Sequence, residues 1–367
     1  LVTAVAAFAL VDRALERQGL TRVLGLAAGC TFYLASGLTY QTSALFAIVP
    51  LTAVLLLRAA PTERADIKWT AAHLGAIFGS LVVGFLLMRV LSDGAAREAA
   101  ARMVIEPHPF IKLLWFVRNP LPNSIALFAL RDSFATPPWF WLVVAAVVVG
   151  VVLGFVYGTH NAQQRRRWLS VALLMPFVAH SVSLAASSQA IGYRTLLPLS
   201  GLFLVLFVFG LRSVLARLKW RRAVETAALG ALVLAGAVLA SHNSLTLIAE
   251  PQGNEWRLFQ AAVSRLPLGK ETSVYIVRPT TSYRSTERIY ADEYGSLSSD
   301  SQWAALEMFR AAIRQRFPQG LPEGTSYTLT TSITPPIMPY DLVLDLRELK
   351  DQGERAAASP ESTASGH

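Results

Sequence analysis

The residues of this sequence best suited to chemistry are polar and ionisable side chains that interrupt long apolar segments. Tyr40 and Gln41 break one such segment, and Tyr193 and Arg194 begin another. A guanidinium presents a planar pair of donors that matches a phosphate, so Arg194 is a candidate phosphate ligand with Tyr193 as its neighbour. Tyr40 and Gln41 are candidates for the wall of a polar cavity. A simpler interpretation stays open for both pairs, because aromatic and basic residues also contact water and headgroups at membrane surfaces.

A second group of ionisable residues lies in one segment between two apolar stretches. Glu106, His108, Lys112 and Arg118 place charges of both signs within a short distance along the chain. Together they are candidate substrate-binding residues at a membrane boundary. Each of them alone is explained equally simply as a solvated loop charge.

The common motifs of soluble enzymes are absent from the sequence. It contains no glycine-rich phosphate loop, no H-E-x-x-H, no paired CxxC and no G-x-S-x-G. The six histidines have no ligand spacing, so we predict no metal site built from protein side chains, and a divalent cofactor cation stays an open question. A single cysteine, Cys30, excludes internal disulfides.

The composition indicates which elements must position these residues. Hydrophobic residues make up 53% of the 367 residues and charged residues only 16%, which is typical of a polytopic α-helical membrane protein. We expect about eight transmembrane helices, the first of them beginning upstream of Leu1. The expected spans are Leu1–Val11, Val23–Leu38, Ser43–Leu57, Thr70–Met88, Pro138–Tyr157, Trp168–Ala186, Thr195–Leu215 and Ala223–Ile248.

The distribution of lysine and arginine predicts the orientation of these spans. Basic residues concentrate in four loops, at 13–22, 58–68, 165–167 and 212–222, and strict alternation places all four on one side, which the positive-inside rule assigns to the cytoplasm. The Tyr40 turn, a long loop at 89–137 and the C-terminal segment then lie on the outer face. The basic excess belongs to the membrane part, so the net charge of +9 does not indicate a nucleic-acid partner.

The C-terminal segment has a soluble composition. After the transmembrane domain at 1–249, residues 250–350 show the order helix, strand, helix, strand, strand, which predicts a small extracytoplasmic α/β module. Six of its apolar residues are expected to be buried together in the core, namely Val274, Ile276, Leu306, Phe309, Leu342 and Val343. Residues 351–367 are rich in Ala, Ser and Glu, so a disordered tail is expected.

Three short patterns resemble a known family. They are Tyr40-Gln41, Tyr193-Arg194, and Lys112…Trp115-Phe116…Pro120-Leu121…Ala126-Leu127-Phe128. Over about residues 23–215 the chain resembles bacterial multi-spanning glucosyltransferase-domain proteins of the O-antigen glucosylation type, with a GT-C-like organisation. The resemblance implies a polyprenyl-phosphate sugar donor. It also implies a catalytic acidic residue in a first outer loop, which would lie upstream of Leu1, so no catalytic residue is assigned.

The sequence therefore predicts a membrane glycosyltransferase, a hexosyltransferase that moves a sugar from a polyprenyl-phosphate donor to a cell-envelope glycan acceptor on the outer face. Its expected partners are membrane lipid, the lipid-linked donor and the acceptor, and its expected location is the bacterial inner or plasma membrane, as a multi-pass protein. A transporter, flippase or polymerase-like protein handling lipid-linked sugars is the alternative, and a non-catalytic scaffold is the third class. A transporter should show internal repeats and interrupted helices with ionisable residues at mid-membrane.

Overall fold

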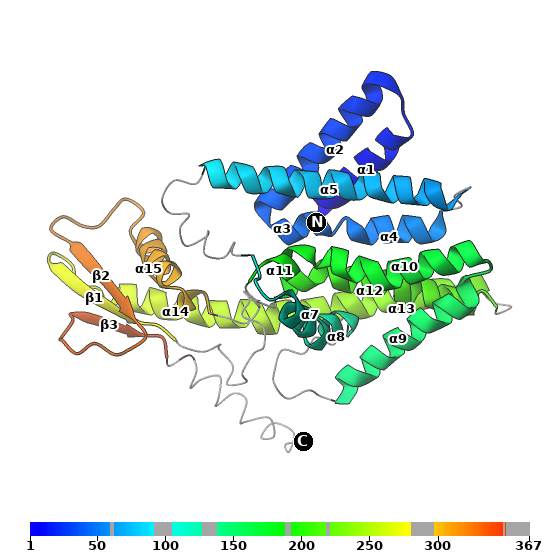
Figure 1. Ribbon diagram of the computed structural model, residues 1–367. Helices are drawn as coiled ribbons and strands as arrows, with labels where there is room; N and C mark the ends of the chain where they lie inside the picture. Colours follow the sequence, from blue (N-terminus) through cyan, green and yellow to red (C-terminus); the bar gives the residue numbers. More distant parts are fainter. Residues whose placement is uncertain are drawn as a thin grey trace, which may run out of the picture. The chain divides into compact units, whose positions relative to one another are not determined.

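The computed structural model describes residues 1–58, 62–91, 105–126, 138–187, 192–217, 221–279, 297–347 and 349 (Figure 1). The described chain is mostly helical and contains one small sheet. It forms two compact units, a first that ends at Ala231 and a second that begins at Leu232. Residues 92–104 and 127–137 of the predicted outer loop and the predicted tail at 351–367 lie outside the described residues.

The first unit is built from helices alone. They are α1 (Val2–Leu15), α2 (Gly19–Thr39), α3 (Gln41–Leu45), α4 (Ile48–Leu57), α5 (Glu63–Leu91), α7 (Pro109–Arg118), α8 (Pro120–Ile125), α9 (Pro138–Gly158), α10 (Ala162–Ala179), α11 (Ser181–Ala185), α12 (Tyr193–Leu215) and the start of α13 (Arg221–Asn243). Three stretches in the described part are long and apolar enough to cross a membrane, namely Glu63–Val90, Phe140–Gly158 and Arg194–Leu215. The chain is thus a helical protein that associates with a membrane.

Two of the expected spans are interrupted helices. Tyr40 adopts an extended backbone between α2 and α3, and a further break separates α3 from α4 before Ile48. Likewise, α10 ends before His180 and α11 begins after it. A helix break frees backbone groups from the internal hydrogen-bond ladder, so such breaks in membrane proteins line cavities or protein interiors. Both interrupted segments contribute residues to the cavity described below.

Glycines allow α9 and α12 to pack at close range. A Cβ atom built on Gly210 would lie only 1.9 Å from the carbonyl oxygen of Gly150. A Cβ on Gly154 would lie 2.9 Å from the Cα of Gly210. Small residues at such crossings let two membrane helices approach closely enough for backbone packing.

Replacing Gly210 by alanine is therefore expected to destabilise the first unit by about 1–3 kcal/mol, because the new methyl group meets rigid backbone and not a mobile side chain. The measurement is the thermal unfolding midpoint of the full chain in detergent. Gly79, which has open space around its Cβ position on α5, provides the matched control. If Gly210→Ala unfolds at the same temperature as Gly79→Ala and the wild type, the close crossing of α9 and α12 is wrong.

The second unit places three parallel strands beside helices. Its elements are the end of α13, η1 (Ser244–Ala249), α14 (Glu250–Ser264), β1 (Glu271–Val277), η2 (Ser298–Asp300), α15 (Gln302–Arg316), β2 (Ser326–Ser332) and β3 (Leu342–Asp345). The strand order is β2-β1-β3, with Val274 opposite both Leu329 and Leu342. The core contains Phe259, Val274, Ile276, Phe309, Leu342 and Leu344.

Two residues expected in that core lie outside it, Val343 and Leu306, of which Leu306 on α15 is only partly buried. Val343 is 44% exposed, whereas Leu342 and Leu344 are buried. Successive side chains of a strand point to opposite faces of the sheet, so Leu342 and Val343 cannot both enter the same core. The prediction that Val343 is buried was wrong.

Candidate functional site

A cavity of about 380 Å³ lies where α2, α3, α5, α11 and α12 meet. Met88 near the end of α5 and Thr195 near the start of α12 line it, so it lies at the end of two of the apolar spans. The wall also includes Tyr40, Gln41, Thr42, Ser80, Ser183 and the apolar residues Leu38, Leu81, Phe85 and Val182. The cavity therefore combines hydroxyl groups with an apolar lining at a membrane boundary.

The structure brings the two predicted polar pairs together. The guanidinium carbon of Arg194 lies 5.4 Å from the ring centroid of Tyr40, a cation–π geometry. Thr42 Oγ1 donates a hydrogen bond of 3.0 Å to the Arg194 carbonyl, which joins α3 to the start of α12. Gln41 is exposed at the start of α3 and lines the cavity. Tyr193 begins α12, but its side chain is outside the described residues.

Lys112 is a buried cation in α7, which packs against α11. Its residue is only 1% exposed, and its Nζ lies 4.3 Å from the ring centroid of Trp115. Burial lowers the pKa of Lys112 from its ordinary value, while the negative charge of Glu106 acts in the opposite direction. A cation that binds a phosphate regains the electrostatic stabilisation that burial takes away.

Backbone hydrogen bonds join the segment that holds Glu106 to the end of α11, which lines the cavity. The Glu106 amide donates a 3.0 Å hydrogen bond to the carbonyl of Ala185, beside the isolated bridge between Ile105 and Ala186. Glu106 Oε1 accepts a hydrogen bond of 2.9 Å from the backbone N–H of His108. Since Ala186 lines the cavity, Glu106 lies next to the cavity wall.

The other two candidates of this segment do not line the cavity. The side chains of His108 and Arg118 are exposed at the two ends of α7, and neither residue belongs to the cavity wall. The two residues are exposed because they flank α7 or end it, whereas the buried face of this helix carries Lys112, Trp115 and Phe116.

His180 is the residue of this region that sequence reasoning missed. It is 1% exposed, and its ring lies 6.0 Å from that of Trp115 and 5.4 Å from that of Phe116. It occupies the break between α10 and α11. It therefore connects α7 with α11, the segment that lines the cavity. A histidine inside an apolar stretch is the signal that could have identified it.

The described lining of the cavity offers hydroxyl groups but no cation and no assigned base. The nearest candidate cations are Arg194, which packs on the wall residue Tyr40, and Lys112 of α7, which packs against α11. Arg194 and Lys112 can stabilise a phosphate group, and no cluster of three His, Cys, Asp or Glu residues that could hold a metal ion occurs among the described residues. No family model, no curated protein and no solved structure matches this chain. Its activity therefore has to be inferred from the chemistry of this cavity.

Proposed function

We propose that this chain is a membrane glycosyltransferase that moves a sugar from a polyprenyl-phosphate donor to a cell-envelope acceptor on the outer face of the membrane. The observation that carries the proposal is the cavity at the end of two apolar spans, whose wall includes Tyr40, together with the Arg194 guanidinium that packs on the Tyr40 ring. A lipid-linked donor approaches from the bilayer and the acceptor approaches from water. A site at their boundary serves both.

The proposed reaction needs two functions from the protein. The acceptor hydroxyl oxygen forms a bond to the anomeric carbon while the bond from that carbon to the phosphate oxygen breaks, and the hydroxyl proton passes to a base. Arg194, held on the wall residue Tyr40, stabilises the negative charge that develops on the leaving phosphate, and Lys112, buried in α7 next to α11, adds positive potential beside the cavity. The base that accepts the hydroxyl proton is not assigned to any residue of this sequence.

The proposed topology has eight spans, with the basic loops inside and the C-terminal unit outside. Contacts within the first unit bring neighbouring basic loops together. Trp69 Nε1 donates to Asp12 Oδ1 at 2.9 Å, and Arg166 lies 3.2 Å from Glu63 in an ion pair. Arg217 lies 4.3 Å from the ring centroid of Tyr157, just before the loop that leads to α10. Basic loops gathered at one end are what the positive-inside rule requires of strict alternation.

Cysteine labelling from outside tests this topology. After Cys30 is replaced, cysteines at Ser187 and Glu323 are expected to react with a membrane-impermeant maleimide in intact cells, whereas one at the exposed Ala162 should react only after permeabilisation. Denatured samples control for expression of each variant. External labelling of Ala162, or protection of Glu323, would contradict the orientation.

The activity test uses membranes that contain the full chain and a polyprenyl-phosphate hexose with a radiolabelled sugar. Label should pass to envelope glycan and the free polyprenyl phosphate should appear in equal amount. The interrupted helices α3–α4 and α10–α11 are also a feature of transporters. Movement of the intact donor between leaflets without release of polyprenyl phosphate would favour that class and contradict sugar transfer.

A further inference from the structure

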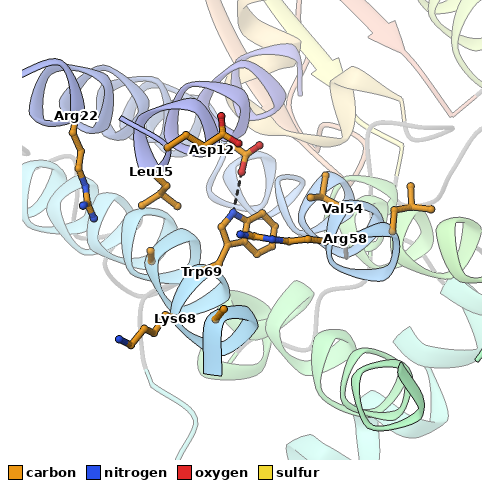
Figure 2. A pocket seen from close by; sticks show the side chains of 11 residues that line it. Asp12, Leu15, Arg22, Val54, Arg58, Lys68 and Trp69 are labelled. Carbon is orange, nitrogen blue, oxygen red and sulfur yellow. Dashed lines mark hydrogen bonds between the residues drawn. The ribbon is translucent and has the colours of Figure 1, made fainter. Parts of the chain in front are cut away.

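A second and larger cavity, of about 610 Å³, lies at the opposite end of α5 from the candidate site. It is formed by the end of α1, the start of α2, the end of α4 and the first turns of α5 (Figure 2). These first turns begin the apolar span Glu63–Val90, so the cavity lies at the other boundary of that span. Sequence reasoning used its basic residues only to orient the helices.

The charges around this cavity are unbalanced. Arg22 of α2, Lys68 of α5 and Arg58, the residue that follows α4, line it, and Asp12 and Glu16 are the acidic residues of its lining. One unit of positive charge is left in excess. In the described part of the chain the side chains of Arg22 and Lys68 form no hydrogen bond or ion pair. Cations that converge on a cavity in this way favour an anion.

One of the two carboxylates already has partners within the protein. Asp12 Oδ1 accepts the 2.9 Å hydrogen bond from Trp69 Nε1, and it lies 3.5 Å from Nε2 of the fully buried His73. The ring of Trp69 in turn carries the guanidinium carbon of Arg58, 4.9 Å from its centroid (Figure 2). Asp12 is therefore already bound to Trp69 and His73 within the protein. Arg58 is held by the Trp69 ring and not by a carboxylate.

A buried arginine holds the backbone at the end of α4, next to Arg58, in place. Arg167 of α10 donates from Nη1 to the carbonyls of Leu55, at 3.1 Å, and of Arg58, and it pairs through Nη2 with Asp66 of α5. The side chains of Arg167 and Asp66 are only 10% and 9% exposed. These contacts hold the end of α4 against α5, so the cavity is formed before any ligand arrives and binding requires little ordering.

The remaining lining is apolar and continues onto exposed apolar surface. Leu15, Val54 and Leu57 form part of the wall, and Leu57 is 59% exposed. Leu20, two residues before the cavity residue Arg22 on α2, is 72% exposed. Apolar surface beside cations and a tryptophan at the end of a membrane span is the environment of phospholipid headgroups.

We propose that this cavity binds the phosphodiester of an anionic membrane phospholipid, with the phosphate between Arg58, Lys68 and Arg22 and the acyl chains along the exposed leucines. A phosphodiester carries one negative charge, which neutralises the excess of the lining. The two cavities lie at opposite ends of α5, so this inference stands independently of the proposed sugar transfer.

The test measures lipid binding to the full chain in detergent by native mass spectrometry. The probes are dioleoylphosphatidylglycerol, dioleoylphosphatidylcholine and glycerophosphoglycerol, the soluble headgroup without acyl chains. We expect the wild type to bind phosphatidylglycerol in preference to phosphatidylcholine and not to bind the soluble headgroup. Replacing both Arg58 and Lys68 by glutamine should weaken phosphatidylglycerol binding about tenfold, or about 1.4 kcal/mol.

Two further variants separate the cavity from general surface charge and from misfolding. Replacing both Arg13 and Arg64 by glutamine removes the same charge from exposed neighbours outside the cavity, and it should leave binding unchanged. Glu16→Gln removes a lining carboxylate, so it should raise affinity about threefold, a gain that a damaged fold cannot produce.

Three results would overturn the proposal. They are an equal loss of binding in the Arg13/Arg64 control, unchanged binding in the Arg58/Lys68 variant, and competition by glycerophosphoglycerol at the affinity of the lipid. The last result would identify a soluble phosphodiester as the ligand.

Discussion

Sugar transfer is expected to fall about tenfold to a hundredfold when Arg194 is replaced by alanine, since one charge-assisted hydrogen bond to the leaving phosphate contributes about 1.5–3 kcal/mol. Arg194→Lys should fall between the wild type and alanine, because it keeps the charge and loses the planar fork. The measurement is the initial rate of transfer from a polyprenyl-phosphate hexose in membranes with matched amounts of protein. The partial rescue by lysine distinguishes phosphate binding from mere packing against Tyr40.

Arg118 supplies the matched control for this experiment. Arg118 is exposed at the end of α7, whereas Arg194 packs on the wall residue Tyr40. Arg118→Ala should therefore transfer sugar at the wild-type rate. Equal rates for the wild type and Arg194→Ala would remove Arg194 from the donor site, and an equal loss in Arg118→Ala would point to surface charge.

The helices could be predicted from the apolar runs, because a stretch of about 20 apolar residues has few other structures available to it. The breaks inside them could not. Tyr40 interrupts the chain as the polar pattern indicated, but the second break, at His180, depends on how α7 packs its aromatic residues against this point. Such packing is a tertiary property, and a local window of sequence does not contain it.

The candidate site shows the same division. Residue types identified Tyr40 and Arg194 separately, whereas their contact joins positions that lie far apart along the chain. The second cavity was missed for a related reason. Asp12 and Trp69 lie just outside the expected spans Leu1–Val11 and Thr70–Met88, and only the fold shows that they form a hydrogen bond beside His73. Ionisable residues within helices were the available signal.

Val343 illustrates a different kind of error, since the sequence contained the information needed to avoid it. Alternation along a strand requires Leu342 and Leu344 to share one face, and the structure buries both. Hydrophobicity alone had placed Val343 with them. The pairing of β3 with β1 then determines which of the two faces is the core.

The second unit is expected to lose stability as the pH rises from about 4 to about 7. Burial, and then the nearby charge of Glu255, raise the pKa of Asp300 from 3.8 to about 7, while Arg278 acts in the opposite direction. The folded state therefore holds the Asp300 proton more tightly than the unfolded chain does. Below about pH 4 Asp300 is protonated in the folded and in the unfolded state, and its contribution to the free energy of unfolding has its highest value. This stability is lost as the pH rises toward about 7, the pKa of Asp300 in the folded state.

Asp300→Asn removes this titration and keeps the shape of the side chain. At pH 8 it should stabilise the second unit by about 2–4 kcal/mol relative to the wild type, and at pH 4 the difference should vanish. The measurement is hydrogen exchange of the β1 and α15 amides in the full chain at several pH values, corrected for the intrinsic exchange rates. Glu255 stays in place in both proteins, where it accepts hydrogen bonds from the Ser298 and Ser299 amides.

Asp345→Asn provides a control of opposite sign in the same unit. Hydrogen bonds from Arg347 are the main cause that lowers the pKa of Asp345, so its ionised form stabilises the fold. Asn at this position should destabilise the unit at neutral pH, and its effect should fade as the pH falls through the folded pKa of Asp345. If both variants shift protection in the same direction at pH 8, the pH dependence reflects net charge and not the burial of Asp300. If Asp300→Asn raises protection and Asp345→Asn lowers it, each in its own pH range, the result supports the burial of Asp300 beside Glu255 as the cause of the pH dependence.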